Sequence, residues 1–202
     1  MNYLAVDTSG FHLTVIAHGD GGDYTYYDED CSLKHSVVLM GAIENALSRA
    51  NLKKEDVDVF CCCLGPGSFT GIRIGVATVK ALAYALKKKV LGVTSFDALA
   101  YYNIKEDTLA IIDARHGHVY CAGYSGGEIS VPPSYVALED LGQYAEKYKF
   151  VTPFRTDGVD ALTVPAAEGF RAAVEAKLRY ASEDTETLHP LYVRKSQAEE
   201  GR

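Results

Sequence analysis

Several residues near the start and the middle of this sequence have types and spacings that suit phosphate chemistry. The glycine-rich turn GPGSFTG at residues 65–71 leads into a helical pattern, and free amides at a helix start can hold an anion. Asp7 and Asp113 each end an apolar stretch, so their carboxylates could hold a magnesium-bound nucleotide between two lobes. The hypothesis is a vestigial nucleotide or anion loop made of Asp7, Thr8, Ser9, Gly65, Gly67, Ser68 and Asp113.

The two standard phosphate-binding motifs do not fit this turn. The phosphate loop of many nucleotide hydrolases has a lysine directly after its last glycine, whereas Ile72 follows Gly71 here. The dinucleotide fingerprint G-x-G-x-x-G also fails, because the third glycine comes one place late and the segment KKKVLGV offers no acid. A tight turn capped by Ser68 or Thr70 is therefore favoured over anion binding.

Signals for other kinds of reactive site are weak. His116 and His118 have the spacing of a metal pair on a strand, but two exposed hairpin histidines are the favoured interpretation. The three consecutive cysteines at 61–63 lie in an apolar run, and no C-x-x-C pair occurs, which indicates small buried side chains in a reduced protein. No G-x-S-x-G motif surrounds Ser68. We therefore expect no catalytic residue, no metal and no other cofactor.

The composition narrows the class of partner. The 202 residues are 48% hydrophobic, which is enough for one sizeable core or two small lobes. The formal net charge of −7 argues against autonomous binding to nucleic acid, which requires a basic face. The first residues lack a signal-peptide pattern, and no apolar run approaches the roughly 20 residues that cross a bilayer. The expectation is a cytoplasmic protein with no membrane partner.

Hydrophobic periodicity divides the first half of the chain into elements in the order β-β-β-α-β-α-β-α. Strands are expected at residues 2–9, 12–19, 24–30, 57–65 and 89–95. Helices are expected at 33–50, 70–86 and 96–102, with Ser32 as the N-cap of the first. This order predicts a mixed sheet with helices on its faces.

The second half starts again with an apolar strand, so a lobe boundary is expected within residues 100–107. Two strands are expected there, at 108–115 and 117–126. Helical patterns cover 138–148 and 166–178. The segments at 131–135 and 151–158 are interpreted as loops, and the tail is interpreted as extended and then helical.

Two of the expected helices carry more apolar surface than one core needs. In the helix over 70–86, one narrow face is small or apolar: Gly71, Gly75, Thr78, Leu82 and Ala85. A second apolar strip has two basic neighbours: Ala77, Ala81 and Tyr84, beside Arg73 and Lys80. In the helix over 33–50, Val38 and Ala42 lie off the core face. This surplus suggests a helical partner interface, and burial in the lobe's own core is an equally weighted alternative.

Five motifs together resemble one protein family. They are LAVDTS (4–9), KHS (34–36), GPGSFTGIRIGVATVKALA (65–83), DARHGHVY (113–120) and PLYVRKS (190–196). In these motifs, their order and their spacing, the chain resembles the TsaB family, which is also called YeaZ. The long central motif is highly specific, and the resemblance covers at least residues 3–125 and the tail.

The resemblance implies an α/β fold of the actin-like, Hsp70-like ATPase class (ASKHA). Its two lobes each hold a mixed sheet flanked by helices, and the second lobe is reduced. In this interpretation residues 1–103 form the N-terminal lobe with the docking helices, and residues 104–187 form the smaller C-terminal lobe. Residues 188–202 form a tail that packs back on the N-terminal lobe.

The resemblance also implies a function. The chain would be a non-catalytic subunit that binds and stabilises a TsaD-like catalytic subunit, which threonylcarbamoylates the anticodon-adjacent adenosine in tRNAs reading ANN codons. A TsaE-like ATPase subunit joins the pair, tRNA is contacted only through the complex, and the subunit alone forms a homodimer. The implied partner-binding residues are His35, Val38, Leu39, Ala42, Arg73, Val76, Ala77, Lys80 and Tyr84.

One departure from the catalytic relative favours a subunit without catalysis. In that relative a His-x-x-x-His metal pair follows the strand after the second helix, whereas Ser95 and Leu99 occupy these positions here. Leucine cannot bind a cation. The alternative is a nucleotide-dependent small-molecule kinase or hydrolase of the same fold that uses Asp7, Ser9, Gly67 and Asp113.

Overall fold

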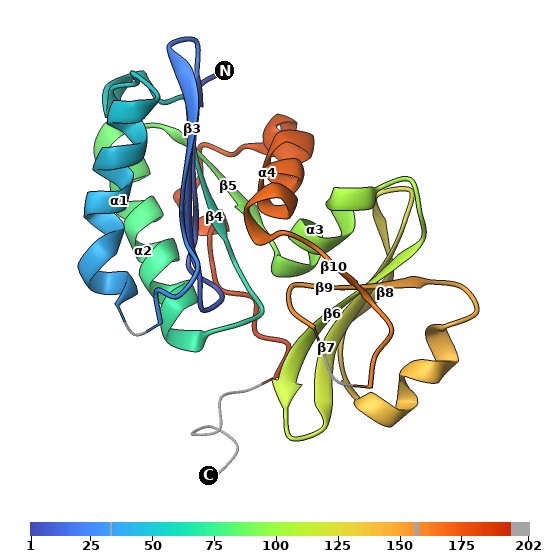
Figure 1. Cartoon of the computed structure of the whole chain (residues 1–202). Coiled ribbons are helices and arrows are strands. Elements are labelled where there is room, and N and C mark those ends of the chain that lie inside the picture. The colour runs from blue at the N-terminus through green and yellow to red at the C-terminus, as the bar shows by residue number, and fades with distance from the viewer. Residues whose placement is uncertain (33, 156–157, 195–202) are drawn as a thin grey trace.

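The computed structural model describes residues 1–32, 34–155 and 158–194, which form two five-stranded sheets with helices around them (Figure 1). The first sheet consists of β1 (Tyr3–Asp7), β2 (Leu13–Gly19), β3 (Gly22–Asp28), β4 (Val59–Cys63) and β5 (Lys89–Val93). The second consists of β6 (Thr108–Arg115), β7 (His118–Ser125), β8 (Glu128–Ala137), β9 (Lys149–Thr152) and β10 (Leu162–Thr163). The strand orders are β3-β2-β1-β4-β5 and β10-β9-β6-β7-β8.

The α-helices of the described chain are α1 (His35–Arg49), α2 (Phe69–Leu86), α3 (Ser95–Ala100) and α4 (Ala166–Lys177). Short 3-10 helices lie at Lys54–Asp56, Tyr101–Asn103, Leu138–Tyr144, Leu178–Tyr180 and Thr185–Thr187. In Figure 1, α1 and α2 lie side by side on one face of the first sheet, and α4 lies on its other face. The first sheet is therefore the middle layer of an α/β/α arrangement.

β1 and β4 of the first sheet are buried on both faces, because alternate side chains of a strand point to opposite sides and helices cover each side. Along β1, Leu4 and Val6 belong to the core under α1 and α2, whereas Tyr3 and Ala5 belong to the core under α4. β1 pairs antiparallel with β2 and parallel with β4, which pairs parallel with β5. Burial on both faces explains why the β1 and β4 sequences are continuously apolar.

Two helices join the sheets into one molecule. Phe96 and Leu99 of α3 pack in a core with the second sheet, whereas Ala98 packs in a core with the first. A side-chain carbon on Gly169 of α4 would overlap the carbonyl oxygen of Ala98, so the two helices touch at their backbones. Phe170 is fully buried against the first sheet, although the expected division assigned residues 104–187 to the second lobe. The lobe boundaries themselves stay a prediction.

The predicted element order of the first half is confirmed, and local features differ. Residue 33, where the first helix was expected to begin, lies outside the described residues. The N-cap of α1 is Lys34, without a side-chain cap, and Ser32 does not hold that position. Residues 131–135 were expected to be a loop but belong to β8, which is an edge strand and so tolerates Pro132 and Pro133.

The other expected loop and the tail differ in part as well. Val151 and Thr152, the first residues of the loop expected at 151–158, belong to β9, whereas residues 156–157 lie outside the described chain. Residues 138–148 hold a 3-10 helix over Leu138–Tyr144. In the tail, Leu188 is buried in the core under α1 and α2, and the Leu191 amide donates to Leu64 O at 2.8 Å. The helical turn expected at the end of the tail falls in 195–202, outside the described residues.

Among the helices of the described residues, α2 is long and apolar enough to cross a membrane, judged by length and composition alone. This differs from the expectation that no apolar run approaches that length. Ile72, Val76 and Val79 of α2 nevertheless pack in the core beneath the first sheet. A core helix of a soluble protein passes the same test.

Candidate functional site

The glycine-rich turn lies between β4 and α2 and packs directly against the turn that follows β1. The Ser68 hydroxyl accepts a hydrogen bond from Gly71 N at 3.2 Å, so the predicted serine cap is confirmed. Ser68 N donates to Ser9 O at 2.7 Å, and Thr8 Oγ1 donates to Gly71 O at 2.7 Å. The amides of Ser68 and Gly71, which a bound anion would need, therefore already donate hydrogen bonds within the chain.

The glycines of this region allow chain segments to approach at backbone distance. A side-chain carbon on Gly67 would overlap the carbonyl oxygen of Ser9, and one on Gly71 would overlap that of Thr8. On Gly75 it would overlap the hydroxyl oxygen of Thr8. At Gly71 and Gly75, the small face predicted on α2 is therefore covered by the turn after β1.

Asp7 is buried at the end of β1 and is already paired. Its Oδ2 lies 3.3 Å from His12 Nε2, and its Oδ1 accepts a hydrogen bond from Ser9 N at 2.8 Å. Burial opposes the charged form, but the hydrogen bonds from His12 and Ser9 and the His12 charge lower the pKa of Asp7. Burial likewise opposes a charged His12, but the hydrogen bond and charge of Asp7 raise the His12 pKa. His12 is therefore the partner of the carboxylate that the hypothesis assigned to a bound cation, and it neutralises that carboxylate when it is protonated.

A second buried polar cluster lies beside this pair. Ser95 Oγ donates to Ser9 Oγ at 3.2 Å, and Cys63 Sγ lies 3.4 Å from Ser9 Oγ and 3.2 Å from Ser95 Oγ. Burial, with the nearby Asp7 charge, raises the pKa of Cys63 well above its ordinary value. Because a thiol needs its thiolate form to attack or to bind metal, Cys63 is unsuited to either role near neutral pH.

Gly65 joins this cluster, because its carbonyl oxygen accepts a hydrogen bond from Ser95 N at 2.8 Å, whereas Asp113 lies apart from it. Asp113 is exposed near the end of β6, and its Oδ1 accepts a hydrogen bond from Arg115 N at 2.7 Å. His118 stacks on Tyr135 with ring centroids 4.6 Å apart, and its Nδ1 lies 2.9 Å from the carbonyl oxygen of His116. Within the described residues no group of three or more His, Cys, Asp or Glu side chains could hold a metal ion.

The structure therefore unites part of the predicted loop. Asp7, Thr8, Ser9, Gly65, Gly67 and Ser68 are brought together, whereas no hydrogen bond or ion pair of the described chain joins Asp113 to them. Sequence reasoning missed His12, the partner of Asp7. Its one signal was a lone histidine five residues after the aspartate, at the start of an apolar strand.

The predicted partner-binding residues differ in how far their side chains are buried. The side chains of His35, Leu39, Ala42 and Val76 are buried in the first lobe, and their part in partner binding stays a prediction. Val38 is half-buried. Arg73 is exposed but donates to Tyr192 OH at 2.8 Å, and half-buried Lys80 pairs with Glu186 at 3.1 Å.

The outer faces of α1 and α2 carry exposed apolar residues, two of which sequence reasoning missed. Val37 exposes 82% of its surface and Met40 exposes 47%, both on α1. Ala77 and Ala81 are exposed on α2, as is Tyr84, which exposes 79% of its surface. As candidates for partner contact, these five residues are called the docking surface: Val37, Met40, Ala77, Ala81 and Tyr84.

Two mixed sheets flanked by helices, with a glycine-rich turn packed on the turn after β1, define an α/β protein of the actin-like ATPase fold. A Bacteroides thetaiotaomicron protein described as having this fold and an unknown function superposes with a TM-score of 0.51. It is 7% identical and covers 87% of this chain and 95% of its own. The predicted fold class is therefore confirmed.

The chain belongs to the TsaB (YeaZ) family. The family model described as TsaD, tRNA N6-adenosine threonylcarbamoyltransferase, matches residues 28–145. The Bacillus subtilis tRNA threonylcarbamoyladenosine biosynthesis protein TsaB is 34% identical over 69% of this chain and 64% of its own length. A Pseudomonas aeruginosa structure described as similar to peptidase YeaZ superposes with a TM-score of 0.78, at 27% identity, over 96% of this chain and 99% of its own. The matched segment spans less than two thirds of the B. subtilis relative.

Proposed function

We propose that this chain is a non-catalytic subunit in tRNA threonylcarbamoyladenosine biosynthesis. It binds and stabilises a TsaD-like catalytic subunit in the cytoplasm, and a TsaE-like ATPase subunit joins the pair. The chain contacts tRNA only through the complex and forms a homodimer when alone. Residues 1–103 form the docking lobe, residues 104–187 the smaller lobe and residues 188–202 a tail against the first.

The exposed docking surface is the observation that carries this proposal. Val37 and Tyr84 are large side chains that leave about four fifths of their surface in water. Large exposed apolar side chains on two neighbouring helices suggest protein–protein contact. Small Ala77 and Ala81, on the same helix as Tyr84, would let a partner helix approach closely.

The absence of catalysis is supported by the chemistry of the site. The carboxylate of Asp7 is already paired with His12, and the glycine-rich turn packs on the chain's own backbone. Leu99 is buried at one of the two positions where the catalytic relative has metal-binding histidines. A kinase or hydrolase of the same fold would need Asp7 free for a cation. Calorimetry with ATP and magnesium distinguishes the two functions, because micromolar affinity with turnover would favour the enzyme.

The docking surface is tested by the substitution Ala77→Glu. A charge on the exposed face of α2 should weaken binding to the TsaD-like subunit of the same organism at least tenfold and should abolish homodimers in light scattering. Ala145→Glu, at an exposed alanine of the second lobe, is the matched control and should bind normally. Normal pairing by a folded Ala77→Glu protein would place the interface elsewhere.

A further inference from the structure

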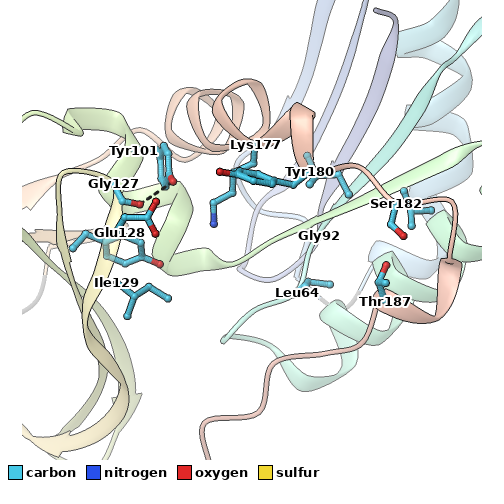
Figure 2. A pocket seen from close by; sticks show the side chains of 13 residues that line it. Leu64, Gly92, Tyr101, Gly127, Glu128, Ile129, Lys177, Tyr180, Ser182 and Thr187 are labelled. Atoms are coloured by element: carbon cyan, nitrogen blue, oxygen red, sulfur yellow. Dashed lines mark hydrogen bonds between the residues drawn. The ribbon is translucent and has the colours of Figure 1, made fainter.

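A cavity of about 390 Å³ opens between the edge of the first sheet and the second sheet (Figure 2). One wall comes from β5, through Val90, Leu91 and Gly92. The opposite wall comes from the turn before β8 and the start of that strand, through Gly127, Glu128 and Ile129. Because β5 and β8 are both edge strands, the cavity separates two sheet edges. In Figure 2, Lys177 at the end of α4 points into the space between them.

The β5 edge presents an unpaired peptide group to this cavity. Val90 N donates to Ser182 O at 2.8 Å and Ser182 N donates to Val90 O at 2.9 Å, so the backbone groups of Val90 point away from β4. Backbone groups alternate in direction along a strand, so the N–H and C=O of Gly92 point to the same side as those of Val90. Within the described chain neither group of Gly92 has a hydrogen-bond partner.

The pairing at Ser182 is a single bridge, so it covers only part of this edge. Beyond it, the next outward-facing residue of β5 is Gly92, which is half-buried and lines the cavity. An unpaired strand edge is a template for another extended segment, because main-chain hydrogen bonds can continue the ladder. The backbone therefore indicates a polypeptide as the ligand.

The charges around the cavity indicate which side chain that polypeptide carries. Lys177 Nζ lies 2.6 Å from Asp97 Oδ1, so a buried carboxylate already neutralises this lysine. Glu128 is exposed in the wall, and no described residue forms an ion pair with it. Of the charged residues that line the cavity, Lys177 is therefore paired, whereas Glu128 is a carboxylate without an ion-pair partner in the described chain. A basic side chain would complement it.

We propose that this cavity is a docking site for an extended peptide segment of another protein, which pairs with Gly92 on the β5 edge and places a basic side chain against Glu128. The site uses none of the docking-surface residues on α1 and α2. It therefore stands independently of the proposed function.

The test uses the full chain and a phage-displayed library of random heptapeptides as the probe. Enriched peptides are synthesised with a fluorescent label, their affinity is measured by anisotropy, and exchange of the Gly92 amide is followed by NMR. We expect enriched peptides to carry arginine or lysine and to slow exchange at Gly92 at least tenfold. Glu128→Gln should weaken binding about three- to fivefold, as expected for a partly exposed ion pair.

Two controls make the outcome decisive. Glu146→Gln removes an exposed carboxylate outside the cavity and should leave the affinity unchanged. A peptide N-methylated at the residue that pairs with Gly92 should lose binding, because it can no longer donate to the strand edge. A library without enrichment overturns the proposal, and so do enriched peptides that leave Gly92 exchange unaltered. Equal affinities for Glu128→Gln and Glu146→Gln overturn the recognition of a basic side chain.

Discussion

Two groups of opposite charge, Asp7 and His12, are buried together at the end of β1, and each exposes 4% of its surface. The raised pKa of His12 means that its contribution to stability is complete below the unfolded value of about 6.5 and is lost as pH rises through the folded value. The lowered pKa of Asp7 means that its contribution is present above about 3.9 and is lost as pH falls through the folded value. The pair therefore stabilises the fold most between about pH 4 and pH 6.5.

His12→Ala tests this pair. Removing the imidazole leaves the buried Asp7 carboxylate without its counter-charge, so we expect a loss of about 3 kcal/mol in unfolding free energy at pH 5.5. The loss should become smaller as pH rises through the folded pKa of His12, because the original protein then gives up the imidazole proton. Urea unfolding over a series of rising pH values that starts at pH 5.5 measures the difference. The double variant Asp7→Asn/His12→Ala should recover part of the loss, and a pH-independent cost would contradict the ion pair.

The role of a single residue could be predicted from the sequence only where it depends on neighbours along the chain. Ser68 could be predicted as a cap because its role depends on residues within three positions. The pairing of His12 with Asp7 could not be predicted, because it depends on how the β1–β2 hairpin turns. Val37 and Met40 were missed for a similar reason: exposure depends on how α1 is rotated against the sheet, and small errors in helix phase change it.

Secondary-structure elements approach one another most closely where the N-terminal end of α2 meets the turn after β1. Gly71→Ala would force a methyl group onto the carbonyl oxygen of Thr8, so we expect a loss of about 2 kcal/mol from overpacking. Gly41→Ala on α1 is the matched control, because nothing lies within 4 Å of its added carbon. It should stabilise the helix by up to about 1 kcal/mol. Thermal unfolding of both variants measures these changes, and equal effects would contradict the role of Gly71.

Helices and strands could largely be predicted where the hydrophobic pattern of the segment itself identifies them. β1 and β4 of the first sheet are continuously apolar and could be identified from that pattern alone. β8 could not, because its two prolines suggested a loop, and only its place at a sheet edge makes them acceptable. For α4, the helical pattern was clear, but which sheet it covers depends on contacts distant in sequence.

The whole molecule is held together by the return of the chain from the second sheet to the first. Phe170 is fully buried against the first sheet, and neighbouring Gly169 touches α3, which packs on both sheets. Because α3 and α4 share this contact, the two sheets should unfold in one cooperative transition. Phe170→Ala should then lower the unfolding free energy by about 3–5 kcal/mol throughout the molecule.

Hydrogen exchange of amides in both sheets tests this cooperativity. In Phe170→Ala, the most protected amides of β6 should lose as much protection as those of β1, although β6 lies in the other sheet. Leu162→Ala, at a half-exposed residue of β10, is the control and should change stability by less than about 0.5 kcal/mol. If β6 keeps its protection while β1 loses it, the lobes unfold separately. In that case α4 stabilises only the lobe that carries the docking surface.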